Sequence, residues 1–254
     1  MNRQAQAVIL LLLGGAVIRA SITDLYLRYV KEGLRPFLIA AGLLLVVAAI
    51  MTLWYELRPS AARTTVPATP VPGTPDPAGG VGAAHGHTHH EPRVGWLLIL
   101  PVLGLLLVAP PALGSYAVSQ AGSTVSAPRE SDYPPLPEGD PVQVSVLDYA
   151  ARALFDRGTS IGDRRVRLTG FIATGPDGEP ILARMVLSCC AADGRPVKLG
   201  LTGDVPAGLP DDSWVEVVGR YTDRLGRDPV NDAEIPYLDV ESWREVPVPK
   251  QQYD

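Results

Sequence analysis

The only two cysteines of the chain, Cys189 and Cys190, stand side by side in the segment LSCCAADG, residues 187–194. A relaxed disulfide holds its two Cα atoms about 4.4–6.8 Å apart, whereas neighbours across a trans peptide are about 3.8 Å apart. A disulfide between them would therefore be strained and easily reduced. Three uses remain for the pair: filling a hydrophobic core, thiol redox chemistry, or binding a metal ion.

The residues before the pair, PILARMVL, alternate as a strand does, which places Met185, Leu187 and Cys189 on one face. In a strand that continues through the pair, Cys189 is a small buried hydrophobic residue and Cys190 faces outward, so the two sulfurs cannot share one ion. A bend at AADG would instead bring both sulfurs and Asp193 to one side, and thiolates select zinc, Cu(I) and similar ions. Cys189, Cys190 and Asp193 are therefore a candidate metal site, and the end of the strand decides between these interpretations.

All four histidines of the chain lie within six residues, in the segment HGHTHH: His85, His87, His89 and His90. They belong to residues 59–92, which contain seven prolines and five glycines and cannot bury a core. Imidazole binds zinc, copper and nickel well, and His-rich tracts in such segments are typical metal binders. We expect these histidines to bind zinc loosely, as a collector of metal; the alternative is a plain polar linker.

Composition argues against two classes of function. Residues 142–254 carry 13 Lys and Arg against 18 Asp and Glu, a net charge of −5, so this part lacks the basic surface of a nucleic-acid binder. It also contains no histidine, which excludes a Cys–His or Ser–His catalytic pair within it, and the chain shows no P-loop, HExxH, G-x-S-x-G or dinucleotide fingerprint. We expect a protein that is not an enzyme.

Apolar segments predict a membrane protein with three spans. The clearest is PFLIAAGLLLVVAAIMTLWY, residues 36–55, whose 20 uncharged residues match a bilayer core. A shorter apolar segment, residues 5–20, precedes it, and a third begins near Gly95 and meets Pro110 and Pro111. The expected organisation is two transmembrane helices in 1–58, a Pro/Gly/His-rich linker in 59–93, a third transmembrane helix in 94–120, a Pro-rich linker in 121–141 and a β domain in 142–254.

The first segment has one alternative, a cleaved signal peptide. Arg19 interrupts its apolar run and no small-residue cleavage site follows cleanly, which favours a retained helix. Three spans place the 19–35 loop and the C-terminal domain on one side of a cell membrane. Basic residues flank both sides in similar numbers, so the positive-inside rule does not orient the chain; we take the C-terminal domain as extracytoplasmic.

The C-terminal domain is expected to be mainly β, an OB-like barrel with one short helix. The helix begins at Ser145 and stops at Gly158, with an apolar face of Leu147, Ala150, Ala151, Leu154 and Phe155. Five strand patterns follow: RRVRLTGFIAT, PILARMVLSCC, RPVKLGLTG, SWVEVVGRYTD and IPYLDVESWREV. Glycines inside VRLTGFI and WVEVVGRY are typical of strands that bend sharply into a small closed barrel. Trp214 and Trp243 are expected to pack in it, and Asp211, Asp212, Asp223 and Asp228 to lie in solvated loops.

This order of features resembles the YcgQ family of bacterial membrane proteins. The resemblance is carried by YVKEGLRPFLIAAGLLLVVAA, the His-rich linker, WLLILPVLGLLLVAPPALGS and, most specifically, VLSCCAADGRPV. It implies one subunit of a two-component permease, whose partner is a multi-span permease of the YcgR type, and a link to zinc limitation.

The expected function is therefore a non-catalytic permease subunit in the membrane that handles a divalent metal, zinc, with its β domain docking on or gating the partner. The alternative is a membrane-tethered thiol redox or metal sensor protein that uses the Cys189–Cys190 pair. A structural tether without metal chemistry is a third.

Overall fold

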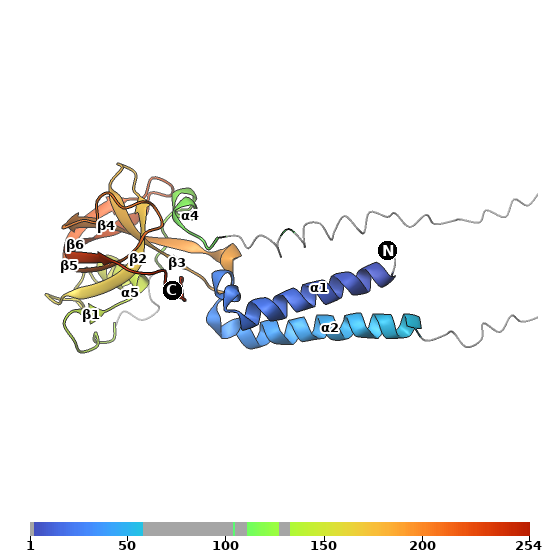
Figure 1. Cartoon of the computed structure of the whole chain (residues 1–254). Helices are drawn as coiled ribbons and strands as arrows, with labels where there is room; N and C mark the ends of the chain where they lie inside the picture. The colour runs from blue at the N-terminus through green and yellow to red at the C-terminus, as the bar shows by residue number, and fades with distance from the viewer. Residues whose placement is uncertain (1–2, 58–103, 105–110, 127–132) are drawn as a thin grey trace, which may run out of the picture. The chain divides into compact units, whose positions relative to one another are not determined.

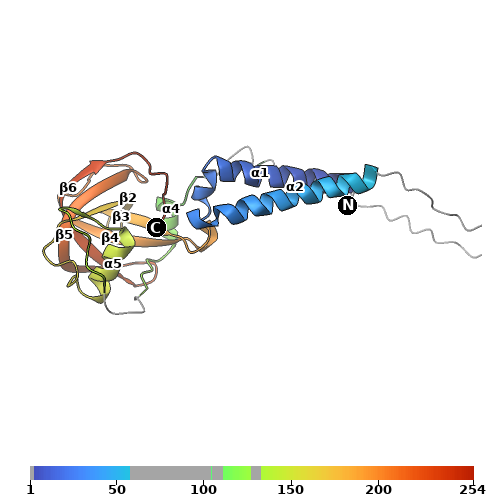
Figure 2. The same cartoon turned by 90° about the horizontal axis from the view of Figure 1, so that it is seen from below.

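Five strands of the C-terminal domain close into a barrel (Figures 1 and 2). The structure is a computed structural model, and it describes residues 3–57, 104, 111–126 and 133–254. The strand order is β2-β3-β4-β6-β5, and pairing of β2 with β5 closes the ring; β4 and β6 are parallel and the other barrel pairs antiparallel. The barrel is OB-like, as the strand patterns predicted. Its strands are β2 (Val166–Thr174), β3 (Pro180–Val186), β4 (Arg195–Gly203), β5 (Trp214–Arg227) and β6 (Glu234–Glu245), and a short β1 (Val142–Gln143) pairs with β2.

Glycines allow two of these strands to come close to their neighbours. A Cβ on Gly170 would lie 2.7 Å from the carbonyl oxygen of Ala183, and one on Gly219 would overlap the carbonyl of Asp239. The register of β5 against β6 shifts between Val218 and Gly219, which is the bend expected from the motif WVEVVGRY.

Helix α5 (Val146–Phe155) contributes to the core inside the barrel. Ser145 caps it, since its hydroxyl oxygen accepts the Asp148 N–H at 3.0 Å. The predicted apolar face was right at Ala150, which is buried, and at Leu147, which packs partly buried against the core, but wrong at Phe155, which is exposed. The large buried ring is Tyr149, whose hydroxyl donates to the Tyr237 carbonyl at 2.6 Å. The helix turns this face inward because Tyr149 fills more of the core than Leu147 and also finds a hydrogen-bond acceptor there. The buried helix residues are Val146, Tyr149, Ala150, Arg152 and Ala153.

A second hydrophobic cluster lies outside the barrel, under helix α4 (Ser115–Gln120). Val118 of this helix is buried with Phe171, Met185 and Trp214. The prediction of a membrane helix over 94–120 was therefore wrong for its last part, because residues 111–120 pack on the β domain; residues 94–103 and 105–110 lie outside the described residues. Asp212 lies in an exposed turn, as predicted, and its carboxylate also accepts the Ser115 N–H at 2.6 Å at the start of α4.

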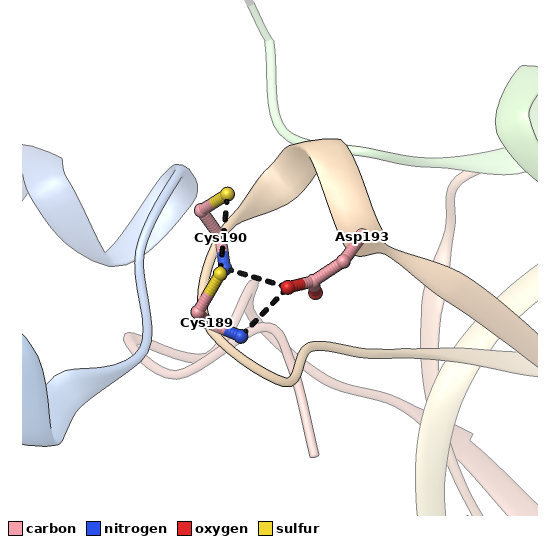
Figure 3. Close-up of side chains that lie close together, drawn as sticks. All are labelled: Cys189, Cys190 and Asp193. Carbon is pink, nitrogen blue, oxygen red and sulfur yellow. Dashed lines mark hydrogen bonds between the residues drawn. The ribbon is translucent and has the colours of Figure 1, made fainter.

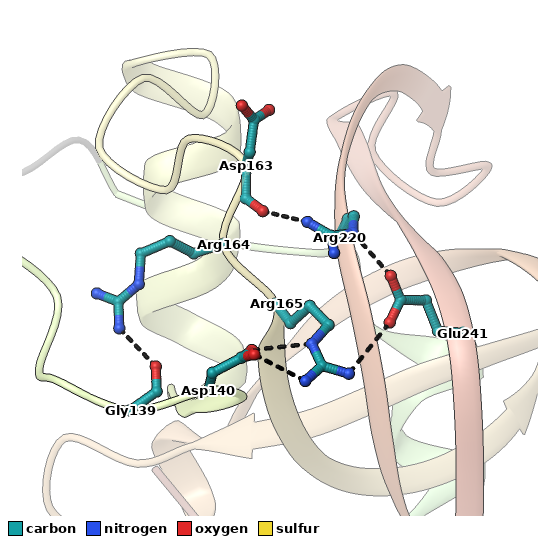
Figure 4. Close-up of polar contacts among 7 residues, drawn as sticks. All are labelled: Gly139, Asp140, Asp163, Arg164, Arg165, Arg220 and Glu241. Atoms are coloured by element: carbon teal, nitrogen blue, oxygen red, sulfur yellow. Dashed lines mark hydrogen bonds and ion pairs between the residues drawn. The ribbon is translucent and has the colours of Figure 1, made fainter.

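Part of the predicted Pro-rich linker is fixed to the barrel (Figure 4). Arg165 pairs with Asp140 at 2.8 Å, and Arg164 donates to the Gly139 carbonyl at 2.8 Å. Arg220 continues the network, because it binds the Glu241 carboxylate at 2.7 Å and donates to the Asp163 carbonyl. Residues 133–141 are thus a strap on the β domain rather than a free linker.

The N-terminal part holds helices α1 (Arg3–Ile22) and α2 (Arg35–Leu57). They lie side by side in Figures 1 and 2 and approach closely at two glycines: a Cβ on Gly14 would lie 2.9 Å from the Gly42 carbonyl oxygen. Among the described residues, one helix is long and apolar enough to cross a membrane, Glu32–Tyr55, while the apolar part of α1, Gln6–Ile22, is shorter. Phe37 and Leu44 of α2 are each 70% exposed, as expected of side chains that face lipid.

The loop between these helices packs with the β domain. Residues 20–36 and the domain from residue 110 onward form one unit, whereas the remainder of α1 and α2 belongs to another. The loop contains two 3-10 turns, η1 (Leu25–Arg28) and η2 (Glu32–Leu34).

Candidate metal site at the Cys turn

Strand β3 ends at Val186, three residues before the cysteines. We call residues 187–194 the Cys turn. Because the strand has ended, the alternation of side chains no longer separates the pair: the two Sγ atoms lie 3.6 Å apart on the same side (Figure 3). The interpretation of Cys189 as a core residue was wrong, since Cys189 is exposed and Cys190 half-buried. Met185 and Leu187 do lie in the core as predicted, in the cluster under α4.

The carboxylate of Asp193 holds the Cys turn in this conformation. One oxygen accepts the Ser188 N–H at 2.8 Å, and the other accepts the N–H groups of Cys189 at 2.8 Å and Cys190 at 3.3 Å. Asp193 ends a short 3-10 turn, η4 (Ala191–Asp193), whose first residue follows Cys190 directly. Three consecutive amides thus point at one carboxylate, and this fixes the backbone from which both sulfurs project.

The charge of Asp193 also governs the protonation of Cys189. Hydrogen bonding to the Asp193 carboxylate, and then to the Cys190 thiol, raises the pKa of Cys189 to about 12. Hydrogen bonds from the Cys189 thiol and from the N–H groups of Cys189, Ser188 and Cys190 lower the pKa of Asp193 to about 2. At neutral pH and without metal, Cys189 is therefore a thiol beside a carboxylate, and a thiol is a poor nucleophile.

The geometry of the pair suits a tetrahedral ion. Zn–S bonds of about 2.3 Å at a tetrahedral angle place two sulfurs about 3.8 Å apart, close to the 3.6 Å between Cys189 and Cys190. One ligand atom from each of Cys189, Cys190 and Asp193 lies within 4.8 Å of the others. The three predicted ligands are therefore brought together. Since the Asp193 carboxylate already accepts three N–H groups, the two thiols are the stronger ligand candidates.

The loop between α1 and α2 borders the site, and nothing in the sequence indicated this. Val30 forms an antiparallel bridge with Cys190, and the blue ribbon of the loop passes beside the pair in Figure 3. Tyr253, near the C-terminus, donates its hydroxyl to the Arg28 carbonyl at 2.8 Å and accepts the Leu113 N–H at 3.0 Å. These contacts join segments more than 100 residues apart, so local sequence patterns carry no signal for them.

The other predicted metal ligands, His85, His87, His89 and His90, lie outside the described residues. The structure therefore does not place them with respect to the cysteines.

A pocket of about 480 Å³ lies at the opposite ends of β3 and β4 from the Cys turn. The β2–β3 turn, with Asp177 and Glu179, and the β5–β6 hairpin, with Arg224 and Arg227, line it. The Arg224 guanidinium stacks on the Tyr237 ring, 4.3 Å from its centroid. The pocket shares no residue with the Cys turn, so the two are separate features of the domain.

Residues 152–253 match the family model of the DUF1980 C-terminal domain. The match runs from within α5 to Tyr253 and contains the whole barrel and the Cys turn. It is consistent with the resemblance to the YcgQ family. No curated protein and no solved structure matches the chain.

Proposed function

We propose that this chain is a non-catalytic membrane subunit that binds a divalent metal, zinc, through the thiolates of Cys189 and Cys190. The observation that carries the proposal is the pair of Sγ atoms 3.6 Å apart on one exposed turn. Two protein thiolates leave the remaining coordination positions open, as expected of a site that passes an ion on rather than of a closed structural site. The cysteines would supply a fixed site, and the four linker histidines a loose one that feeds it.

The membrane part of the proposal is supported by α2 and its surroundings. The apolar surface of α2 is exposed. The close approach of Gly14 to Gly42 shows that α1 packs on α2, which favours a retained first helix over a cleaved signal peptide. The loop 20–36 and the domain from residue 110 onward form one unit. If α2 crosses the membrane, the chain must return between residues 58 and 110, where the third apolar segment lies.

The partner in the proposal is a multi-span permease of the YcgR type, on which the β domain docks or which it gates. This rests on the resemblance to the YcgQ family and on the DUF1980 match, which is consistent with it. Co-purification of the chain with such a permease tests it.

The redox alternative is disfavoured for thiol exchange that starts at Cys189, because this thiol is protonated at neutral pH. A thiol that exchanges readily with disulfides is largely ionised near neutral pH, whereas the Asp193 carboxylate raises the pKa of Cys189 to about 12. A metal ion displaces the thiol proton on binding, so the raised pKa does not prevent metal binding but makes it depend on pH.

Zinc titration by calorimetry on the full chain in detergent tests the metal site. Three proteins are compared: the wild type, a variant with His85, His87, His89 and His90 changed to alanine, and the double variant Cys189→Ser/Cys190→Ser. We expect the histidine variant to keep one tight site and the cysteine variant to lose it. Equal tight binding in the wild type and the cysteine variant would contradict the proposal, and equal total binding in the wild type and the histidine variant would remove the collector role.

A further inference from the structure

Backbone hydrogen bonds join the Cys turn to residues 25–34, which we call the docking loop. The Lys31 N–H donates to the Cys189 carbonyl at 3.1 Å, and the Ala191 N–H donates to the Tyr29 carbonyl at 2.6 Å. Val30 and Cys190 face each other in the bridge between these two bonds. The residues that carry the two sulfurs thus form one side of a short ladder, and the docking loop forms the other.

The docking loop pairs with the Cys turn in the same backbone conformation that places the two sulfurs to bind one metal ion. In extended backbone, Cys189 and Cys190 would direct their sulfurs to opposite faces. In the Cys turn the sulfurs are 3.6 Å apart, and the same backbone presents the Cys189 carbonyl and the Ala191 N–H to the loop. A metal ion held by both sulfurs therefore favours the backbone that the loop recognises.

We propose that metal binding at the Cys turn and docking of the loop on the barrel are coupled, each strengthening the other. This inference rests on the metal site proposed above. Coupling of this kind is reciprocal: if metal favours the docked loop, the docked loop raises the affinity for metal by the same factor. The docking loop leads at Arg35 directly into α2, so occupancy of the site changes how firmly the start of this helix is held.

Lys31 offers a substitution that removes one bond of the ladder, provided that the loss of its side chain is controlled for, because Nζ donates to the Leu187 carbonyl at 3.4 Å. Its backbone has φ −61° and ψ 141°, which proline adopts without strain. The preceding residue, Val30, lies in a β bridge, and extended backbone is what a residue before proline prefers. Lys31→Pro therefore removes the N–H that binds the Cys189 carbonyl. Lys31→Ala is the matched control, since it loses the same side chain and keeps the N–H.

Zinc affinity is measured by competition with a chromophoric chelator, on the full chain in detergent and in the background with the four histidines changed to alanine. We expect Lys31→Pro to bind zinc about fivefold more weakly than Lys31→Ala, because one net hydrogen bond of the docked state is lost. Tyr253→Phe, which removes the hydroxyl bound to the Arg28 carbonyl, should weaken zinc binding in the same direction although it lies away from the sulfurs.

Hydrogen exchange tests the same coupling without any loop variant. It is measured with and without zinc on a protein whose docking loop and cysteines are unchanged. We expect zinc to slow exchange in peptides covering residues 25–34 and not in those covering β5. The coupling would be overturned if Lys31→Pro and Lys31→Ala bound zinc equally well and zinc did not change hydrogen exchange in the loop. The proposed metal site would still stand in that case. Absence of any cysteine-dependent zinc binding would remove the proposed function, and the coupling with it.

Discussion

Asp193 controls the Cys turn at the scale of single residues, because it fixes the backbone and sets the charge beside the thiols. Its carboxylate accepts three consecutive N–H groups and raises the pKa of Cys189 to about 12. A residue that orients metal ligands in this way acts on affinity without forming a bond to the ion.

Replacing Asp193 should make Cys189 more reactive. In the variant Cys190→Ser, which leaves Cys189 as the single cysteine, we expect slow alkylation by iodoacetamide at pH 8 and a rate that rises with pH. The added change Asp193→Asn removes the negative charge, lowers the pKa of Cys189 toward its ordinary value and should raise the rate at pH 8 about tenfold or more, because only the thiolate reacts. Mass spectrometry follows the reaction, Asp177→Asn in the exposed β2–β3 turn is the control, and equal rates with and without Asp193 would contradict this account.

The candidate site could be predicted from the sequence only in part, since its residues were found but their arrangement was not. The types and spacing in LSCCAADG led to Cys189, Cys190 and Asp193. Whether Cys189 is buried or exposed depends on where β3 ends. The alternating pattern of side chains continues through Cys189, so the pattern alone does not reveal that the strand ends at Val186, where the Asp193 carboxylate binds the backbone of the turn that follows. The contact with Val30 is set by tertiary packing and leaves no periodic trace.

Elements were better predicted than their connections. All five barrel strands lie within a few residues of the predicted segments because each alternates between glycine and proline turns. The segments taken as linkers, around α4 and the strap 133–141, were harder to predict. Contacts with residues far along the chain hold them to the domain, such as the exposed ion pair of Asp140 with Arg165 and the hydrogen bond from Ser115 to Asp212. Asp228 is the clearest case: it was taken as a solvated residue but is buried against Lys198 at 2.9 Å.

Asp228 should be important for the stability of the domain. Burial raises its pKa, but hydrogen bonds from Lys198 and from the N–H groups of Val230 and Ser123 outweigh this, so its pKa in the folded state is lowered. Its stabilising contribution is therefore present above the unfolded-state pKa of about 3.9 and is lost as the pH falls below that value.

Asp228→Ala should lower the free energy of unfolding by about 3–5 kcal/mol at pH 7, because the Lys198 ammonium is left buried without its partner. Urea unfolding followed by tryptophan fluorescence measures the effect. The matched control is Asp232→Asn, which loses an exposed ion pair with Arg227 and keeps a residue type that tolerates the positive φ of 58° at this position. It should change stability by less than about 1 kcal/mol. Similar small effects in both variants would contradict a structural role for the buried pair.

The pairing of α1 with α2 depends on Gly14. A side chain there meets the Gly42 carbonyl and Val46, whereas one on the neighbouring Gly15 meets nothing within 4 Å. We expect Gly14→Leu to lower the thermal midpoint in detergent, at a cost of about 1–3 kcal/mol from overpacking, and Gly15→Leu to leave it near that of the wild type. A lower midpoint for Gly15→Leu than for Gly14→Leu would show that the helices pack on another face.

At the scale of the whole molecule, the loop 20–36 and the β domain belong to one unit. If α2 spans a membrane, as proposed, both parts lie on the same side of it. Single cysteines introduced at Glu32 and Asp177, in a Cys189→Ser/Cys190→Ser background, should react with an impermeant thiol reagent from the same side of sealed vesicles. A cysteine at Thr74, in the linker between the second and third predicted spans, should react from the other side. Labelling of all three from one side would contradict a membrane-spanning α2.

The central claim, that Cys189 and Cys190 bind one zinc ion together, is tested most directly by zinc X-ray absorption. The full chain is loaded with one equivalent of zinc in the background with the four histidines changed to alanine. We predict two sulfur neighbours at about 2.3 Å from zinc, which are absent in Cys189→Ser/Cys190→Ser. A first shell of oxygen or nitrogen alone at about 2.0–2.1 Å in the protein with both cysteines would contradict the claim.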